Sequence, residues 1–207
     1  MPFGSSEAGL YLRLGLSHIA DLRGYDHLVF VAALTVAYPA SAWRRLLVLV
    51  TAFTVGHSVT LALATTGALR VPTVWIEAAI PATIAATAGL TLWRSRAASV
   101  DEAGSAMTGR YLLAAGFGLV HGLGFSNYLR SLLGGEESLL WPLLAFNAGL
   151  EVGQVMIVAA VMGLGALAVR GGGVPERRWV QGVSMAALLV AVPMVVQRTL
   201  AAMAPPA

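Results

Sequence analysis

Long apolar segments dominate this sequence, and they restrict the chain to folds that a lipid bilayer can hold. Six segments run approximately over residues 24–39, 44–69, 72–93, 110–133, 138–169 and 178–203, separated by arginine, proline and glycine clusters. A helix of about 20 apolar residues crosses roughly 30 Å of hydrocarbon. We therefore predict an all-α, polytopic membrane protein with six transmembrane helices, of which the first is short and the fifth long.

The composition excludes other classes of protein. Of the 207 residues, 57% are apolar and only 11% are charged, whereas a soluble domain has about a quarter of its residues charged. A water-soluble fold, a disordered chain and a nucleic-acid-binding domain are therefore not expected, and the main partner is the lipid bilayer. The chain has no cysteine, so disulfides and thiolate metal ligands are absent.

The segment from Leu10 to Arg23 is interrupted by charged residues and is predicted to be a short amphipathic helix at the membrane interface. The expected organisation is an N-terminal segment (1–23), a six-helix transmembrane domain (24–203) and a C-terminal tail (204–207). Residues 1–10 lack the basic-then-apolar pattern of a signal peptide.

Arginines in short loops predict the orientation. The loops after the first, third and fifth segments hold eight arginines: Arg44, Arg45, Arg94, Arg96, Arg110, Arg170, Arg177 and Arg178. The opposite side holds five: Arg13, Arg23, Arg70, Arg130 and Arg198. This bias predicts a multi-pass protein of the inner (plasma) membrane with both termini outside the cytoplasm.

Ionisable residues inside the apolar segments are the candidate functional residues. Each costs about 2.5–3.5 kcal/mol at mid-bilayer on insertion scales, so a whole set is unlikely to serve packing alone. A hydrogen bond between helices is the alternative for any single one. The predicted metal ligands are His18, Asp26, His27, His57, Glu77, His121 and Glu151, with Ser58, Asn147 and Gln154 as supporting polar residues. No catalytic residue is assigned.

Helical geometry refines this set. Asn147, Glu151 and Gln154 fall within roughly 60° of one another, which predicts one polar stripe facing protein rather than lipid. Glycines at i, i+4 beside Glu151 and around His121 form two small-residue faces, so the two side chains are expected to meet.

Two backbone breaks are also expected. Gly24 is predicted to interrupt the first helix, so that His18 can reach the pair Asp26-His27. Pro81 lies four residues after Glu77, and its missing N–H leaves the Glu77 carbonyl as a potential oxygen ligand, or simply kinks the helix.

A weak internal repeat links two pairs of segments. The pattern Phe-x-x-x-His occurs at Phe53 to His57 and again at Phe117 to His121. Because the offset is two helices, such repeats would run parallel, and chance similarity is the alternative.

Neutral imidazoles with carboxylates suit divalent first-row transition ions rather than Ca²⁺ or Mg²⁺. The residues alone leave Ni, Zn, Cu and Co open.

Five ordered blocks between residues 10 and 155 resemble the HupE/UreJ family of membrane proteins. They contain His18 with Tyr25-Asp26-His27, then Phe53-Thr54-x-x-His57-Ser58, then Glu77, then Phe117-Gly118-x-x-His121-Gly122, then Phe146-Asn147 with Glu151 and Gln154. The resemblance implies a secondary permease for nickel, associated with hydrogenase and urease maturation. Gly56 and Pro81 depart from the family pattern, which has alanine at both positions.

The expected function is that of a permease or binding protein for a divalent transition metal, with a site opening to the non-cytoplasmic side, and the resemblance implies that this metal is nickel. Asp26 and His27 are placed near the outer mouth, and His57, His121 and Glu151 near mid-bilayer. The alternatives are an intramembrane metal-dependent hydrolase or redox enzyme, or a metal-handling assembly factor. A homo-oligomer is compatible with the sequence.

Overall fold

The computed structural model describes residues 5–22, 24–96, 105–133 and 139–204, and these residues form helices and connecting turns without a strand. Arg23 and the tail residues 205–207 lie outside the described ranges. The helices are α1 (Ser5–Ile19), α2 (Asp26–Thr35), α3 (Trp43–Thr65), α4 (Thr73–Arg96), α5 (Ser105–Leu133), α6 (Leu140–Ala166) and α7 (Glu176–Met203). A 3₁₀ turn, Ala40–Ala42, precedes α3, and a π-helical turn, Leu167–Gly171, extends α6.

Within the described residues, five helices are long and apolar enough to cross a membrane, and they correspond to the second to sixth predicted segments. The chain is therefore a multi-pass, all-helical membrane protein. The first predicted segment is a helix of only 10 residues, α2, which is too short to cross hydrocarbon alone.

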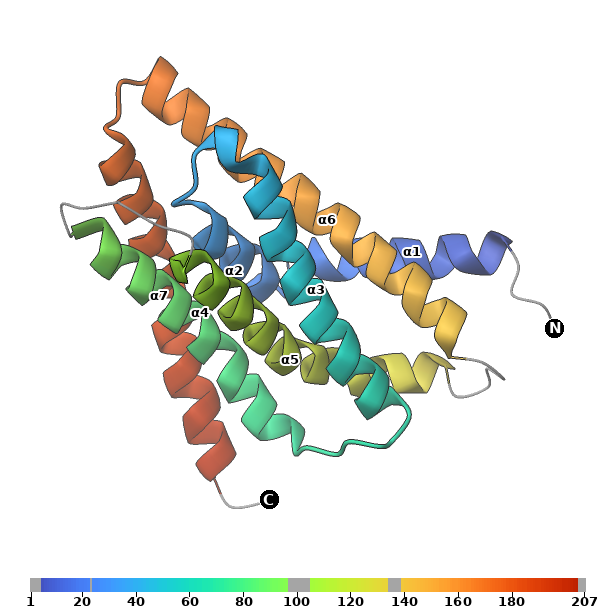
Figure 1. The fold of residues 1–207 in the computed structure, drawn as a ribbon. Helices are drawn as coiled ribbons and strands as arrows, with labels where there is room; N and C mark the ends of the chain where they lie inside the picture. The colour runs from blue at the N-terminus through green and yellow to red at the C-terminus, as the bar shows by residue number, and fades with distance from the viewer. Residues whose placement is uncertain (1–4, 23, 97–104, 134–138, 205–207) are drawn as a thin grey trace.

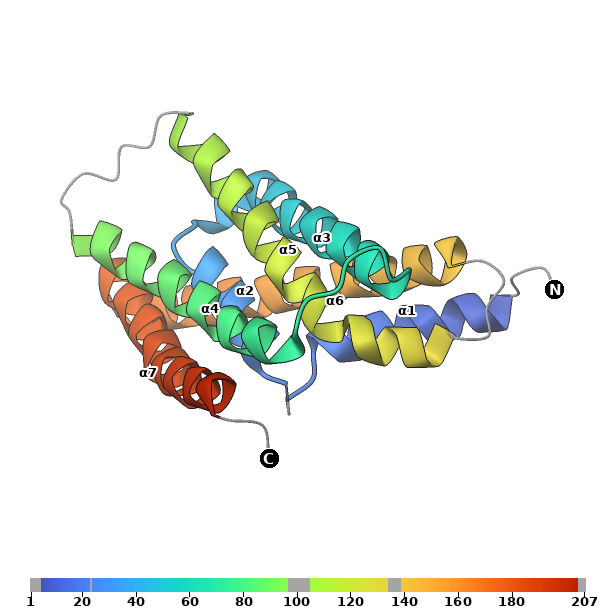
Figure 2. The ribbon, with the colours of Figure 1, turned by 90° about the horizontal axis from the view of Figure 1, so that it is seen from below.

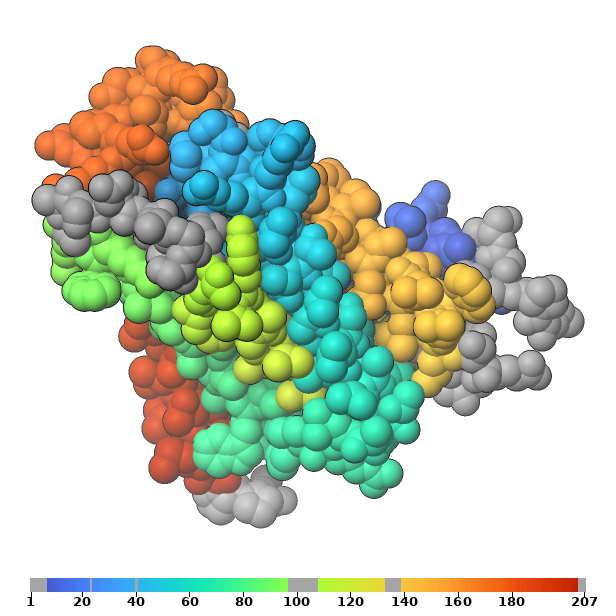
Figure 3. Space-filling view, viewed as in Figure 1, coloured from blue at the N-terminus to red at the C-terminus, as the bar shows by residue number. Residues whose placement is uncertain are grey.

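Three helix pairs make up most of the bundle, and Figures 1 and 2 show them from two directions: α1 with α6, α3 with α5, and α4 with α7. Figure 3 shows α3 along the centre of one face, between α5 and α6. Beyond Arg44 and Arg45 in its first turn, its large exposed residues are apolar, among them Val48, Val55, Val59 and Leu63. This face suits lipid, and it leaves the buried face of α3 for polar residues.

The helix α1 packs lengthwise on the first half of α6. The backbone of Gly15 lies against the carbonyl of Phe146, and that of Gly149 lies against the carbonyl of Leu12. Only glycine allows such a close approach, because a Cβ at either position would collide with the opposite carbonyl. The sequence predicted that this segment lies at the membrane interface. This packing instead shows α1 beside a helix long enough to span the membrane.

The helix α2 continues in the direction of α1 along the same neighbour. Leu12 and Ile19 of α1 pack near Gly149 and Gly153, whereas Thr35 and Val36 at the end of α2 share a cavity with residues 161–170, farther along α6. The break between Ile19 and Asp26 includes Gly24, as predicted. We therefore describe α1 and α2 as two halves of one discontinuous helix, a type of element that forms ion sites in membrane transporters.

The second glycine-mediated pair is α3 with α5. Gly56 lies against the carbonyl of Ala115, Gly118 against that of Phe53, and Gly122 against that of His57. The two glycine faces predicted to bring α5 and α6 together thus face different helices, with α5 packed on α3 and α6 packed on α1. The expected contact between His121 and Glu151 loses its basis for this reason.

The pair of α4 with α7 involves Pro81. Nη1 of Arg198 in α7 donates a hydrogen bond to the Glu77 carbonyl, at 3.3 Å. This carbonyl is the acceptor that the proline leaves without its helical N–H. The proline effect was predicted correctly, and in the structure the freed oxygen accepts a hydrogen bond from an arginine.

The connections gather at two opposite ends of the bundle, as Figure 1 shows. The α2–α3 and α6–α7 connections lie at one end, with the last residues of α4 and the first residues of α5. This is the end that carries the eight arginines listed above, and we call it the arginine-rich end. The first turn of α1 and the last turn of α7 lie away from this end.

Candidate metal centre

Four histidines from four helices meet at the break between α1 and α2. His18 lies in the last turn of α1, His27 is the second residue of α2, and His57 and His121 lie within α3 and α5. The ring centroids of His27 are 4.6 Å from His18, 6.2 Å from His57 and 5.3 Å from His121. The centroids of His18 and His57 are 6.0 Å apart.

These separations suit imidazoles that share an ion. With metal–nitrogen bonds of about 2.1 Å and near-tetrahedral angles, the centroids of two bound imidazoles lie about 5 Å apart. In the described part of the chain, however, no three His, Asp or Glu side chains are already arranged to hold an ion. The centroid distances are thus compatible with a shared ion, while the ring nitrogens do not converge on one point in this structure.

Three of the four histidines are removed from solvent and lipid, and His18 is partly buried. His57 and His121 are 0% and 1% exposed, and His27 is 6% exposed. Five buried ring nitrogens have no hydrogen-bond partner among the described residues: Nε2 of His18, His27 and His121, and both nitrogens of His57. A buried polar atom left unpaired costs about 1–3 kcal/mol. The cluster is therefore costly unless something binds these nitrogens.

Hydrogen bonds fix the tautomer of two rings. Nδ1 of His27 lies 3.1 Å from Oδ1 of Asp26, and Nδ1 of His121 lies 2.9 Å from the Phe117 carbonyl. A carbonyl and an ionised carboxylate only accept hydrogen bonds, so in the neutral rings Nδ1 carries the hydrogen and donates. The lone pair of each ring is then on Nε2, the buried nitrogen that lacks a partner. Histidines that bind metals in proteins are commonly held in this way.

Asp26 therefore acts on His27 in this structure. Its Oδ1 accepts both the ring Nδ1–H and the backbone N–H of His27, the latter at 2.9 Å. The sequence predicted Asp26 as a metal ligand, and the geometry shows an oxygen that orients the ring of His27.

The predicted acids of α4 and α6 have other surroundings. Glu77 is exposed. Glu151 accepts a hydrogen bond from the Thr51 hydroxyl at 2.5 Å. Beside it, Gln154 is fully buried, and its Oε1 accepts from Thr54 at 2.7 Å. Glu151 and Gln154 thus tie α6 to α3 through hydrogen bonds. No described contact joins Glu77 or Glu151 to the histidines.

The supporting residues divide in the same way. The Ser58 hydroxyl donates to the Thr54 carbonyl of its own helix at 2.6 Å. The predicted polar stripe does face protein, since Gln154 is buried and Oδ1 of Asn147 is buried without a hydrogen-bond partner among the described residues. The sequence analysis did not identify Thr51 and Thr54 as partners of the polar side chains of α6; their spacing of three residues, within one turn of α3, was the available signal.

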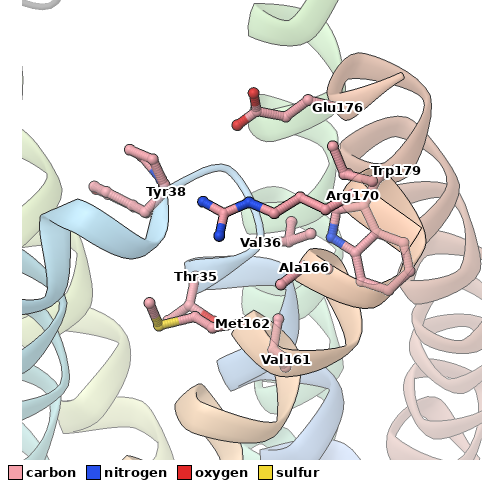
Figure 4. A pocket seen from close by; sticks show the side chains of 12 residues that line it. Thr35, Val36, Tyr38, Val161, Met162, Ala166, Arg170, Glu176 and Trp179 are labelled. Carbon is pink, nitrogen blue, oxygen red and sulfur yellow. The ribbon is translucent and has the colours of Figure 1, made fainter. Parts of the chain in front are cut away.

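The described cavities lie away from the histidines. One, of about 180 Å³, lies between α2, α6 and α7, and Figure 4 shows the Arg170 guanidinium extending into it toward Tyr38, with Trp179 and Glu176 on the α7 side. A second, of about 50 Å³, lies between α2, α4 and α5 and includes Arg94, Arg110 and Phe117 in its wall. Neither has a histidine in its lining.

Comparison with known families decides the relationship. The family described as HupE / UreJ protein matches residues 4–200, nearly the whole chain. The chain belongs to the HupE/UreJ family. No curated protein and no solved structure matches it. Membership in this family suggests a membrane protein linked to nickel or cobalt handling, and it confirms the resemblance that the histidine and glycine blocks indicated.

Proposed function

We propose that this HupE/UreJ protein is a secondary permease for a divalent transition metal ion, with nickel the favoured cargo. The observation that carries the proposal is the set of five buried ring nitrogens, on four histidines inside a multi-pass bundle, that have no hydrogen-bond partner among the described residues. Imidazole nitrogen suits first-row transition ions. Nickel rather than cobalt, zinc or copper follows from the family resemblance.

The position of the histidine cluster supports transport. The cluster lies where α1 ends and α2 begins, and broken helices frame the ion sites of several transporter folds. His27 contacts His121, which lies in the middle part of α5, so the discontinuous helix brings His27 toward mid-depth rather than to an outer mouth. A buried ion site near mid-depth is what alternating access requires.

We assign the arginine-rich end to the cytoplasm, in accordance with the positive-inside rule, with both termini outside. The protein then belongs in the inner (plasma) membrane, and transport toward the arginine-rich end is uptake. An intramembrane hydrolase or redox enzyme is less well supported, because neither described cavity combines room for an organic substrate with a histidine in its wall.

Binding and flux measurements test this proposal. Titration of purified protein with Ni²⁺ should show saturable binding, and His27→Ala or His121→Ala should weaken it at least tenfold. Vesicles containing the protein should take up Ni²⁺, and the same variants should abolish uptake. Ser58→Ala is the matched control, because its hydroxyl bonds only to the Thr54 carbonyl among the described contacts. Absence of Ni²⁺ and Co²⁺ binding by the unmodified protein would refute the proposal.

A further inference from the structure

Three phenylalanines lie one helical turn from the histidines, all on the same side. Phe30 follows His27 by three residues, Phe53 precedes His57 by four, and Phe117 precedes His121 by four. Helix α2 ends at the arginine-rich end, whereas α3 and α5 begin there. In α2, which runs toward this end, the phenylalanine follows its histidine. In α3 and α5, which run away from it, the phenylalanine precedes its histidine. All three rings therefore lie between the histidines and the arginine-rich end. We call these three residues the phenylalanine layer.

The rings of this layer contact one another. The centroid of Phe30 is 4.9 Å from Phe53 and 6.1 Å from Phe117. Phe30 and Phe53 are 0% and 1% exposed. These distances are those of ordinary aromatic packing, so the layer has no room for an ion with its water.

The layer also contacts the histidine cluster directly. The ring of His121 lies 4.9 Å from Phe30 and 5.1 Å from Phe53, measured between centroids. Beyond the layer, the wall of the smaller cavity includes Phe117 together with Arg94 and Arg110. Phe117 therefore separates enclosed histidines on one side from a cavity at the arginine-rich end on the other.

A second aromatic contact closes the opposite side. Phe125 follows His121 by one turn, and its ring lies 3.9 Å from His18 and 5.3 Å from Phe146, nearly parallel to the latter at 14°. The histidines are thus enclosed between two aromatic groups, one toward each end of the bundle.

We propose that Phe30, Phe53 and Phe117 form a gate that separates the histidine cluster from the cavity at the arginine-rich end, and that Phe125 and Phe146 form its counterpart on the other side. This proposal rests on the permease function. Phenyl rings offer a partly hydrated cation no lone pair, and a dry apolar constriction excludes ions by dewetting. A ring that rotates away opens the path without disturbing the neighbouring histidine. The structure with both groups closed is then the occluded form.

Thiol accessibility tests the gate without requiring transport. The chain contains no cysteine, so His121→Cys introduces a single thiol directly behind the phenylalanine layer. A charged, membrane-impermeant methanethiosulfonate is applied to the arginine-rich face of sealed vesicles. The rate of modification is compared between His121→Cys alone, His121→Cys with Phe30→Leu and Phe53→Leu, and His121→Cys with Phe125→Leu and Phe146→Leu.

We expect the Phe30/Phe53 variant to react at least tenfold faster than His121→Cys alone, and the Phe125/Phe146 variant to react at the same rate within twofold. No acceleration in the first variant, or equal acceleration in both, would overturn the proposal. If the Phe30/Phe53 variant cannot be purified in folded form, His121→Cys with Phe117→Leu alone decides. We expect its thiol to be modified at least threefold faster, and an unchanged rate would contradict the gate.

A metal measurement separates this proposal from the permease function. With all histidines intact, Phe30→Leu should leave the equilibrium affinity for Ni²⁺ unchanged within twofold and accelerate its release toward the arginine-rich face. If the unmodified protein binds neither Ni²⁺ nor Co²⁺, the permease proposal fails, while the thiol rates still decide whether the phenylalanine layer closes the path.

Discussion

Replacing Asp26 with asparagine tests whether this side chain orients His27 or binds the metal itself. Asp26 Oδ1 accepts two hydrogen bonds from His27, at 2.9 Å from the backbone nitrogen and 3.1 Å from Nδ1. Asparagine keeps a carbonyl oxygen in this position, so the ring should hold its orientation. The variant removes only the negative charge. In the unmodified protein this charge strengthens the hydrogen bond to the ring of His27 and raises the basicity of Nε2.

The magnitude follows from these contacts. Hydrogen bonds to charged groups contribute about 1.5–3 kcal/mol and neutral ones about 0.5–1.5 kcal/mol, so the loss is about 1–2 kcal/mol. Substitutions at residues that orient metal-bound histidines typically reduce affinity 10–100-fold. We expect Asp26→Asn to weaken Ni²⁺ binding about tenfold, or about 1.4 kcal/mol. Asp26→Ala, which also removes the acceptor, should weaken it further.

Calorimetric titration with Ni²⁺ measures the affinity, and X-ray absorption of the Ni²⁺-loaded protein reports the ligand atoms. Asp21→Asn is the matched control, because Asp21 is an exposed acid in the same connection. An unchanged affinity in Asp26→Asn would refute the orienting role. Loss of an oxygen neighbour from the absorption spectrum would show that Asp26 is itself a ligand.

Three further predictions concern pH, the α3–α6 tie and the glycine contacts. Protons compete with the metal for imidazole nitrogen, so Ni²⁺ affinity should fall as the pH is lowered from about 7.5 to about 5.5, and a flat titration profile would contradict histidine ligation. Glu151→Gln should keep Ni²⁺ affinity within twofold and change the melting temperature little, because the Thr51 hydroxyl can donate equally to an amide oxygen; a tenfold loss of affinity would return Glu151 to the metal site. Gly149→Ala should destabilise the protein by about 1–3 kcal/mol, because the added Cβ would meet the Leu12 carbonyl. Gly163→Ala is the control and should not destabilise it, because the space around Gly163 is open. Equal melting temperatures for the two variants would contradict the α1–α6 contact.

The sequence alone predicted the helices well, because crossing a bilayer depends on local hydrophobic length. The segment predicted at 44–69 is α3, Trp43–Thr65, and that predicted at 72–93 is α4, Thr73–Arg96. The break at Gly24 and the effect of Pro81 on the Glu77 carbonyl were also accessible from sequence, since both depend on residues within one turn or one loop.

The convergence of the four histidines was predictable for an energetic reason. Each would be costly facing lipid, so all four had to face the interior of the bundle, and the structure brings their rings to within 4.6–6.2 Å of a neighbour. The same argument did not determine where the acids lie. A carboxylate can avoid its cost equally well by binding a threonine, as Glu151 does, or by reaching the surface, as Glu77 does.

Only the tertiary structure decided which helices are neighbours. Glycine spacing shows that a helix can be approached closely, but it does not identify the partner, and here α6 receives α1 whereas α5 receives α3. That choice moves α1 from the expected interface to the side of a spanning helix, joins it with α2 into one broken element, and assigns the Glu77 carbonyl to Arg198. The hydrophobicity of a segment depends on its own residues and can therefore be determined from the sequence. Shape complementarity is a property of two surfaces together, so only the tertiary structure shows which helices fit each other.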